Sequence, residues 1–183
     1  GISNLFSFAF PAVKILIEEI KSTFPIIPVV LGGPHPTHLC DYTLKNTKTD
    51  YIIIGEGEVP LIHLWNFITG DLLIDDVPSL AYLNDDGEVI RTVAFPRIKN
   101  INSDNLPFPA RHLLPMENYI GEQEAHGAVN DRWTTILSSR GCPYGCTFCD
   151  SRRTKFISRT ATDVVDEIEH CNNKYGIVEF HFE

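Results

Sequence analysis

Three cysteines near the C-terminal end are the residues of this chain best suited to chemistry. Cys142, Cys146 and Cys149 are spaced as C-x3-C-x2-C within the segment CPYGCTFC. The chain holds five cysteines, and the other two, Cys40 and Cys171, are isolated, so that we expect them to be buried thiols. An odd, clustered set does not suit a disulfide framework, whereas neighbouring thiolates on one loop are typical of a metal site.

The number of ligands separates two kinds of metal site. A structural zinc ion takes four protein ligands, and no nearby His or Cys obviously completes the set. An iron–sulfur cluster with three cysteine-bound irons leaves one iron free for a substrate. Gly141 and Gly145 permit the tight backbone bends that wrapping such a cluster requires. The pattern favours the cluster, and zinc remains the alternative.

A second group of small and polar residues follows apolar runs in the first half of the chain. Ser3 and Leu5 form an S-x-L pattern, and Gly32-Gly33 follows after 26 residues. Pro34 and His35 continue that turn, and the next apolar run is followed by Gly55, Glu56 and Gly57. Taken alone, an S-x-L pattern is uninformative and Gly-Gly after a strand is a common turn. What is notable is that both patterns fall on successive strand ends of a predicted parallel sheet.

The elements that must position both groups alternate between strand and helix. Apolar runs predict strands at residues 1–5, 27–31 and 51–54, and helical periodicity predicts helices at residues 11–23, 38–46 and 60–69. This alternation predicts a parallel, doubly wound α/β sheet. A β-hairpin is expected at residues 81–91, and a second strand–helix–strand unit at residues 134–138, 161–174 and 177–182. Trp65 is expected in the core of the first unit.

Prolines mark the boundary between the two units. Four of them lie between Pro96 and Pro115 among few periodic apolar residues, which predicts a linker. We expect one domain at residues 1–95, a proline-rich linker at residues 96–130 and a second domain at residues 131–183. Because the chain starts without Met in a predicted strand and stops in another, we expect both domains to be truncated.

Composition excludes several classes of protein. Apolar residues make up 43% and charged residues 21%, as in a globular protein, and no apolar run approaches the roughly 18 residues of a membrane helix. A net charge of −9 disfavours nucleic-acid binding. The one tight basic group is expected to be solvated or to hold a small anion: Arg152, Arg153 and Lys155. We expect a cytoplasmic protein, although the absence of a visible signal peptide is not evidence for this.

The cysteine segment resembles the radical S-adenosylmethionine (SAM) superfamily, whose signature is C-x3-C-x-aromatic-C. Phe148 fills the aromatic place, and the resemblance covers residues 131–183, the opening of that family's partial TIM barrel. It implies that the three cysteines hold a 4Fe–4S cluster whose fourth iron binds SAM, with Phe148 beside the adenine. Glu183 is the best match to the acidic residue that meets the amino group of SAM.

The first half resembles the Rossmann-like cobalamin-binding domains that precede radical SAM barrels. The resemblance rests on S-x-L, Gly-Gly-Pro-His and Gly-Glu-Gly-Glu, and runs to about Arg91. It implies that Ser3 donates a hydrogen bond to the base of the cobalamin tail, and that Gly32 and Gly33 line its slot. The other implied cobalamin contacts are Leu5, Pro34, His35, Gly55, Glu56 and Gly57. The family's D-x-H-x-x-G element is not in this chain, so the lower cobalt ligand stays open, and His35 is not expected to replace it.

Together the two resemblances imply a cobalamin-dependent radical SAM enzyme that cleaves SAM to a 5′-deoxyadenosyl radical. Methyl transfer to an unactivated carbon is the expected outcome. A cyclase or oxidoreductase of the anaerobic magnesium-protoporphyrin ester type and a non-catalytic cobalamin-binding module are the alternatives. The implied partners are a small-molecule substrate and a one-electron donor such as flavodoxin or ferredoxin. The substrate stays open, and residues 1–183 alone are expected to be inactive.

Overall fold

The computed structural model describes residues 1–120, 130, 132–149 and 151–182. These residues form two compact units, Gly1–Arg97 and Ile98–Glu183. Each unit has its own sheet and core, and each is described by itself. None of the helices in the described part of the chain is both long and apolar enough to span a bilayer.

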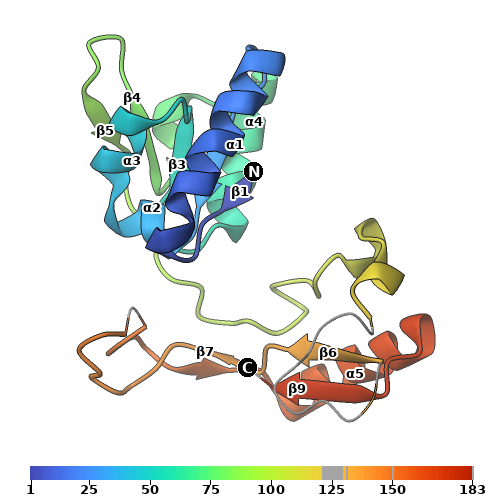
Figure 1. The fold of residues 1–183 in the computed structure, drawn as a ribbon. Coiled ribbons are helices and arrows are strands. Elements are labelled where there is room, and N and C mark those ends of the chain that lie inside the picture. Colours follow the sequence, from blue (N-terminus) through green and yellow to red (C-terminus); the bar gives the residue numbers. More distant parts are fainter. Residues whose placement is uncertain (121–129, 131, 150, 183) are drawn as a thin grey trace. The chain divides into compact units, whose positions relative to one another are not determined.

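The first unit is built on a five-stranded sheet in the order β1-β2-β3-β4-β5 (Figure 1). Its first three strands, β1 (Ile2–Ser3), β2 (Val30–Gly32) and β3 (Tyr51–Ile53), are parallel. The hairpin of β4 (Leu80–Leu83) and β5 (Val89–Arg91) adds two antiparallel strands, as the sequence predicts. Ser3 pairs with Gly32, so the S-x-L and Gly-Gly patterns lie at the same edge of the sheet.

Helices cover both faces of this sheet (Figure 1). The core of one face joins Ile17 of α1 (Phe10–Thr23) and Leu44 of α3 (Cys40–Asn46) to Ile52 of β3. The core of the other face joins Leu64 of α4 (Glu58–Thr69) to Ile53 of the same strand. Because successive strand residues point to opposite faces, Ile52 packs in one core and Ile53 in the other. The doubly wound α/β arrangement predicted from the sequence is confirmed.

Two elements of the first unit differ from prediction. The strand expected at residues 27–31 begins at Val30, because residues 25–27 form a turn that leaves Ile26 94% exposed. The helix expected at residues 38–46 is preceded by a short one, α2 (Pro34–His38), and the two are separated at Leu39. Pro34 occupies the first helical position, where its fixed φ favours helix and its missing N–H costs nothing.

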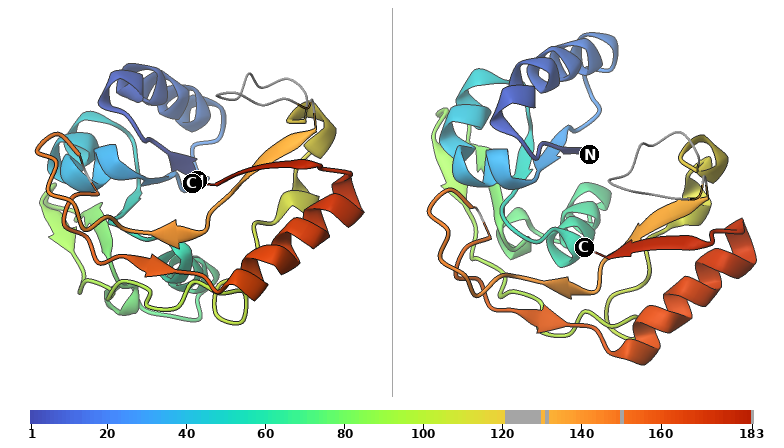
Figure 2. Two further views of the ribbon diagram at one scale, coloured as in Figure 1. Left: turned by 90° about the horizontal axis from the view of Figure 1, so that it is seen from below. Right: turned by 60° about the horizontal axis from the view of Figure 1, so that its bottom comes forward.

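The second unit contains a parallel β–α–β arrangement (Figure 2). Strand β6 (Trp133–Ile136) pairs with β9 (Glu179–Phe182), and α5 (Ala161–Tyr175) connects them. Between β6 and α5 lies the cysteine segment, flanked by the antiparallel pair β7 (Ser139–Arg140) and β8 (Ile157–Ser158). Thr160 caps the start of α5, and Gly176 ends it with a φ of 63°. This is the strand–loop–helix–strand order predicted from the sequence.

The proline-rich segment packs into the second unit instead of standing clear of it. Its described part, residues 98–120, contains the short helices η3 (Arg111–Leu113) and η4 (Met116–Asn118). Ile101 and Ile120 are buried, and Ile120 packs with Cys171 and Ile177. Isolated apolar residues without periodicity predict a linker, but single side chains are enough to anchor such a segment to a neighbouring helix.

Candidate functional site

The carboxyl ends of β1 and β2 form one continuous edge. The backbone N–H of Asn4 donates to the Gly32 carbonyl (2.8 Å), and the N–H of His35 donates to the Asn4 carbonyl (3.2 Å). Ser3 and Leu5, on either side of Asn4, are both exposed. The edge therefore presents the S-x-L side chains to the outside while its backbone is held to the Gly-Gly turn.

The two glycines of this turn have different surroundings. Gly33 has a φ of +99°, and a β-carbon placed there would lie 2.7 Å from the Asn4 carbonyl oxygen. Gly33 is therefore needed for the close approach of the turn to β1. A β-carbon on Gly32 would meet no atom within 4 Å, and the same holds for Gly55 after β3. Gly32 and Gly55 leave open backbone at the carboxyl ends of neighbouring strands.

His35 is buried behind the Gly-Gly turn. Its Nδ1 lies 2.9 Å from the Ser7 hydroxyl oxygen, and its ring centroid lies 4.4 Å from that of Phe10. Burial lowers the pKa of the His35 imidazole, so the ring is neutral at neutral pH. Its position against Phe10 fits a packing residue of the turn.

Buried polar atoms without partners mark this edge. Within the described residues, His35 Nε2 and both amide atoms of the Asn4 side chain are buried and make no hydrogen bond. Buried polar groups of native proteins are nearly always hydrogen-bonded, so unpaired ones point to a missing ligand or water. Open backbone at Gly32 beside unpaired donors and acceptors fits a flat ligand with polar groups, and cobalamin is such a ligand.

The segment after β3 continues the edge. The N–H of Gly55 donates to the Thr37 hydroxyl (3.1 Å), which ties this turn to α2. Glu56 forms an ion pair with Arg97 (3.2 Å), and Gly57 precedes the first turn of α4, where Glu58 lies. The helix dipole favours Glu58, and the ion pair with Arg97 balances Glu56, so both carboxylates are accounted for without a catalytic role.

The cysteine segment is braced by its own backbone and hydroxyls. The N–H of Cys142 donates to the Thr154 hydroxyl (2.9 Å), and the N–H of Cys149 donates to the Cys146 carbonyl (3.2 Å). Gly141 has a φ of +88°, and a β-carbon there would collide with the Lys155 carbonyl. Cys142 and Cys149 are half-buried and Cys146 is exposed, and none of the three forms a disulfide. Their sulfur atoms are available to a metal.

The number of these thiols bears on the kind of metal. A structural zinc ion takes four protein ligands. Three thiolates would bind three irons of a 4Fe–4S cluster and leave the fourth iron open to a substrate. The donor set therefore fits such a cluster.

The remaining predicted residues are placed as follows. Phe148 is 92% exposed beside Cys149, and Glu183 lies outside the described residues. Cys40 and Cys171 are buried as predicted, and burial raises the pKa of both thiols. The prediction of Trp65 as a core residue is wrong, because it is 65% exposed on α4.

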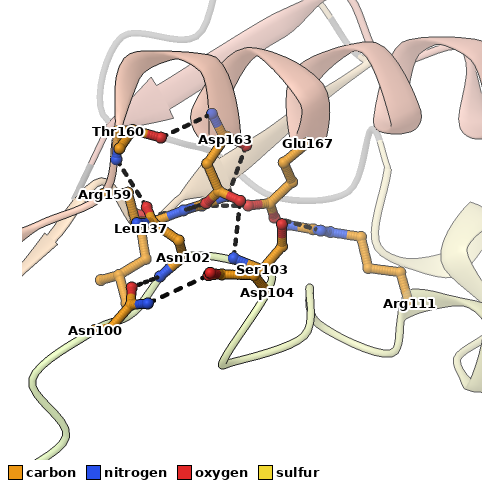
Figure 3. Close-up of polar contacts among 10 residues, drawn as sticks. All are labelled: Asn100, Asn102, Ser103, Asp104, Arg111, Leu137, Arg159, Thr160, Asp163 and Glu167. Atoms are coloured by element: carbon orange, nitrogen blue, oxygen red, sulfur yellow. Dashed lines mark hydrogen bonds and ion pairs between the residues drawn. The ribbon is translucent and has the colours of Figure 1, made fainter.

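Four buried charged residues were missed in the sequence (Figure 3). They lie where α5 begins and where the proline-rich segment packs on it: Arg111, Arg159, Asp163 and Glu167. Helical periodicity directs attention to apolar positions. The signal available was the spacing of Asp163, Glu167 and Cys171 every four residues, which puts two carboxylates on the buried face.

Comparison with known proteins agrees with both halves of the chain. Residues 1–64 match the B12 binding domain family. The chain is 29% identical, over its whole length, to 39% of cytidylyl-2-hydroxyethylphosphonate methyltransferase from Streptomyces wedmorensis. Over 91% of the chain it is 30% identical to 27% of anaerobic magnesium-protoporphyrin IX monomethyl ester cyclase from Cereibacter sphaeroides. The chain thus spans about two-fifths or less of these relatives.

A solved structure shares the fold. The radical SAM methyltransferase TsrM from Kitasatospora setae, with tryptophan and a SAM analogue bound, matches the whole chain with a TM-score of 0.72 at 21% identity, over 36% of its own length. The resemblance predicted from the sequence is confirmed. The chain is a relative of radical SAM proteins that depend on cobalamin.

Proposed function

We propose that this chain is part of a cobalamin-dependent radical SAM enzyme. Residues 1–95 would belong to its cobalamin-binding domain, and residues 131–183 would open its radical SAM barrel. The observation that carries the proposal is the cysteine triplet on the loop between strand β6 and helix α5. In the first unit, open backbone at Gly32 and Gly55 lies at the carboxyl ends of neighbouring strands. The proposal is supported by the match of residues 1–64 to the B12 binding domain family and by the fold likeness of the whole chain to the radical SAM methyltransferase TsrM.

The cobalamin site would lie at the carboxyl ends of β1, β2 and β3. Gly32 and Gly55 would leave room for the tail, and the exposed Ser3 would donate a hydrogen bond to it. Asn4 and His35 hold unpaired polar atoms at the same edge. Gly33 keeps the turn tight against β1. We assign the remaining contacts to exposed or partly exposed neighbours on this edge: Leu5, Pro34, Glu56 and Gly57.

The cluster site would use Cys142, Cys146 and Cys149 as ligands of three irons. A 4Fe–4S cluster bound in this way would supply the electron that splits SAM into methionine and a 5′-deoxyadenosyl radical. Phe148 would pack against the adenine, and Glu183 would accept a hydrogen bond from the amino group of SAM. Gly141 lets the chain turn at the base of this loop.

For the reaction itself, we propose methyl transfer from SAM to an unactivated carbon of a small molecule, with electrons from a flavodoxin or ferredoxin in the cytoplasm. The support is the methyltransferase among the relatives matched over the whole chain. The match to the anaerobic cyclase favours cyclisation as the second candidate.

Reconstitution of the full-length protein tests this function. Anaerobic loading with iron and sulfide, followed by a one-electron reductant and SAM, should give a cluster absorbance and turnover of SAM in the wild type and neither in the Cys146→Ala variant. Bound corrinoid without SAM turnover would support the non-catalytic module instead. One zinc per chain and no iron would contradict the proposed chemistry.

A further inference from the structure

A network of four buried charges lies at the base of the cysteine segment (Figure 3). Arg159 forms ion pairs with Asp163 (2.5 Å) and with Glu167, and Arg111 forms one with the other oxygen of Glu167 (2.7 Å). Glu167 is 1% exposed, and the other three side chains are buried as well. Two cations balance two anions, so the network carries no net charge into the interior.

The two arginines also hold the backbone where the chain leaves β6. Arg111 donates to the Thr135 carbonyl (3.3 Å), and Arg159 donates to the Leu137 carbonyl (3.0 Å). The backbone N–H of Arg159 donates to the Ser138 carbonyl (3.0 Å). Ser138 and Arg159 are the two ends of the segment that carries the three cysteines, so these bonds join its ends.

The proline-rich segment is tied to the same network. The N–H of Ser103 donates to Asp163 (2.8 Å), and the side-chain carbonyl of Asn102 accepts from the N–H of Thr160 (2.8 Å). Arg111 belongs to the same segment. The network therefore connects three pieces of chain: the segment before the second unit, the exit of β6 and the start of α5.

Hydrogen bonds within the cysteine segment also bring its two sides together, as the bond from the Cys142 N–H to the Thr154 hydroxyl does. The strands β7 and β8 pair over two residues each, and the segment between them is largely exposed. Fixing the ends of a long segment costs conformational entropy, which must be offset by contacts at its base. Charge-assisted hydrogen bonds of an arginine that cannot lose its proton are suited to this, because its five donors lie in a rigid fork.

We propose that Arg159, held by Asp163 and Glu167 and supported by Arg111, is a positioning residue for the metal centre. By closing the ends of residues 138–159, it keeps Cys142, Cys146 and Cys149 within reach of one cluster. Arg159 would act through the backbone that it holds and not as a ligand of the cluster. The inference rests on the proposed function for the identity of the metal, but the closure of the segment is independent of it.

The first test compares iron retention in the full-length protein after anaerobic loading with iron and sulfide. Arg159→Gln should lower the affinity for iron about tenfold, which is the lower end of what supports behind metal ligands contribute, as measured by competition with a chelator. Its electron paramagnetic resonance spectrum after reduction should also broaden. Arg159→Lys should rescue only part of the loss, because one ammonium cannot reach Leu137, Asp163 and Glu167 together.

Two further variants and a control separate positioning from folding. Arg91→Gln breaks an exposed ion pair with Asp41 in the first unit and should leave iron retention unchanged. Arg111→Met should weaken iron retention less than Arg159→Gln, since Glu167 keeps Arg159 as its partner. If Arg159→Gln does not fold, Asp163→Asn removes one charge at constant shape and should show the same loss in weaker form.

Hydrogen exchange separates failure of this inference from failure of the proposed function. In metal-free protein, amides within residues 138–159 should exchange faster in Arg159→Gln than in the wild type, with α5 still protected. That result would support the role of Arg159 in holding the ends of residues 138–159 together, even if the wild type binds zinc instead of a cluster. Wild-type iron affinity and wild-type exchange in a folded Arg159→Gln variant would overturn the inference.

Discussion

Adjacent residues of the Gly-Gly turn differ in what they do. Gly33 has a backbone conformation that only glycine adopts readily and touches the backbone of Asn4, whereas Gly32 faces open space. A sequence pattern of two glycines cannot separate the residue that shapes the turn from the residue that leaves room for a ligand. The difference comes from the backbone of Asn4, which fills the β-carbon position of Gly33 and leaves that of Gly32 open.

Substitutions at the two glycines should therefore have separate effects. Gly33→Ala should destabilise the first unit by about 1–3 kcal/mol, because the side chain forces a strained backbone against Asn4. Gly32→Ala should leave stability unchanged, and Gly32→Phe should reduce cobalamin binding at unchanged stability, because its ring fills the open edge. Urea unfolding and the corrinoid content of the full-length protein measure these effects. An unchanged corrinoid content in Gly32→Phe would show that the cobalamin tail does not pass along this edge.

Burial of His35 makes the stability of the first unit depend on pH. The pKa of the ring is lowered in the folded state, so below the ordinary pKa of about 6.5 the unfolded chain binds a proton that the folded one does not. Stability should be constant above that pH and fall as the pH drops below it, with a slope of at most about 1.4 kcal/mol per pH unit.

Urea unfolding of the full-length protein between pH 8 and pH 5 measures this slope. The His35→Asn variant is the control, because it keeps a nitrogen-bearing polar group near Ser7 and does not titrate in this range. Equal pH dependence of the variant and the wild type would assign the slope to other groups.

At the scale of elements, the helices with clear signals were predicted closely. The structure begins α1 at Phe10 and ends α5 at Tyr175, each within one residue of the prediction. Apolar periodicity and a following breaker explain this agreement. The α2–α3 region was predicted less well, because two prolines and a bend at Leu39 interrupt its periodicity.

The cap of α5 offers a prediction at this scale. Thr160 accepts a hydrogen bond from the N–H of Asp163 (3.3 Å) and begins the helix that supports the cysteine segment. Thr160→Ala should lower the stability of the second unit by about 1 kcal/mol, whereas Thr160→Ser should retain it. Thermal unfolding followed by the circular dichroism of the full-length variants provides the measurement, and identical midpoints for both variants would contradict the capping role.

At the scale of the whole chain, each of the two units has buried residues of its own, so the two proposed cofactor sites should respond separately to core damage. Ile52 is fully buried in the first unit and Ile177 in the second. Each change to Ala should destabilise its own unit by about 2–5 kcal/mol through the lost burial and the cavity left behind.

Cofactor content reports which unit is affected. Ile52→Ala should lower cobalamin binding and leave iron content near the wild-type level, and Ile177→Ala should do the reverse. Absorbance and metal analysis of the full-length variants distinguish the two, and loss of both cofactors in either variant would show that the units do not fold independently.

The order of strands and helices, the cysteine triplet and the glycine turns follow from the sequence by itself, because they depend on local periodicity and on residue types at fixed spacing. The tertiary structure decided that the Asn4 backbone closes on Gly33 and not on the β-carbon position of Gly32. It also decided that residues 98–120 pack with the second unit, and that four charged residues meet in its interior: Arg111, Arg159, Asp163 and Glu167. These are contacts between residues far apart in the chain. Local sequence patterns do not predict such contacts. A charged residue can be buried only where a partner of opposite charge, here distant in the sequence, lies beside it in the fold.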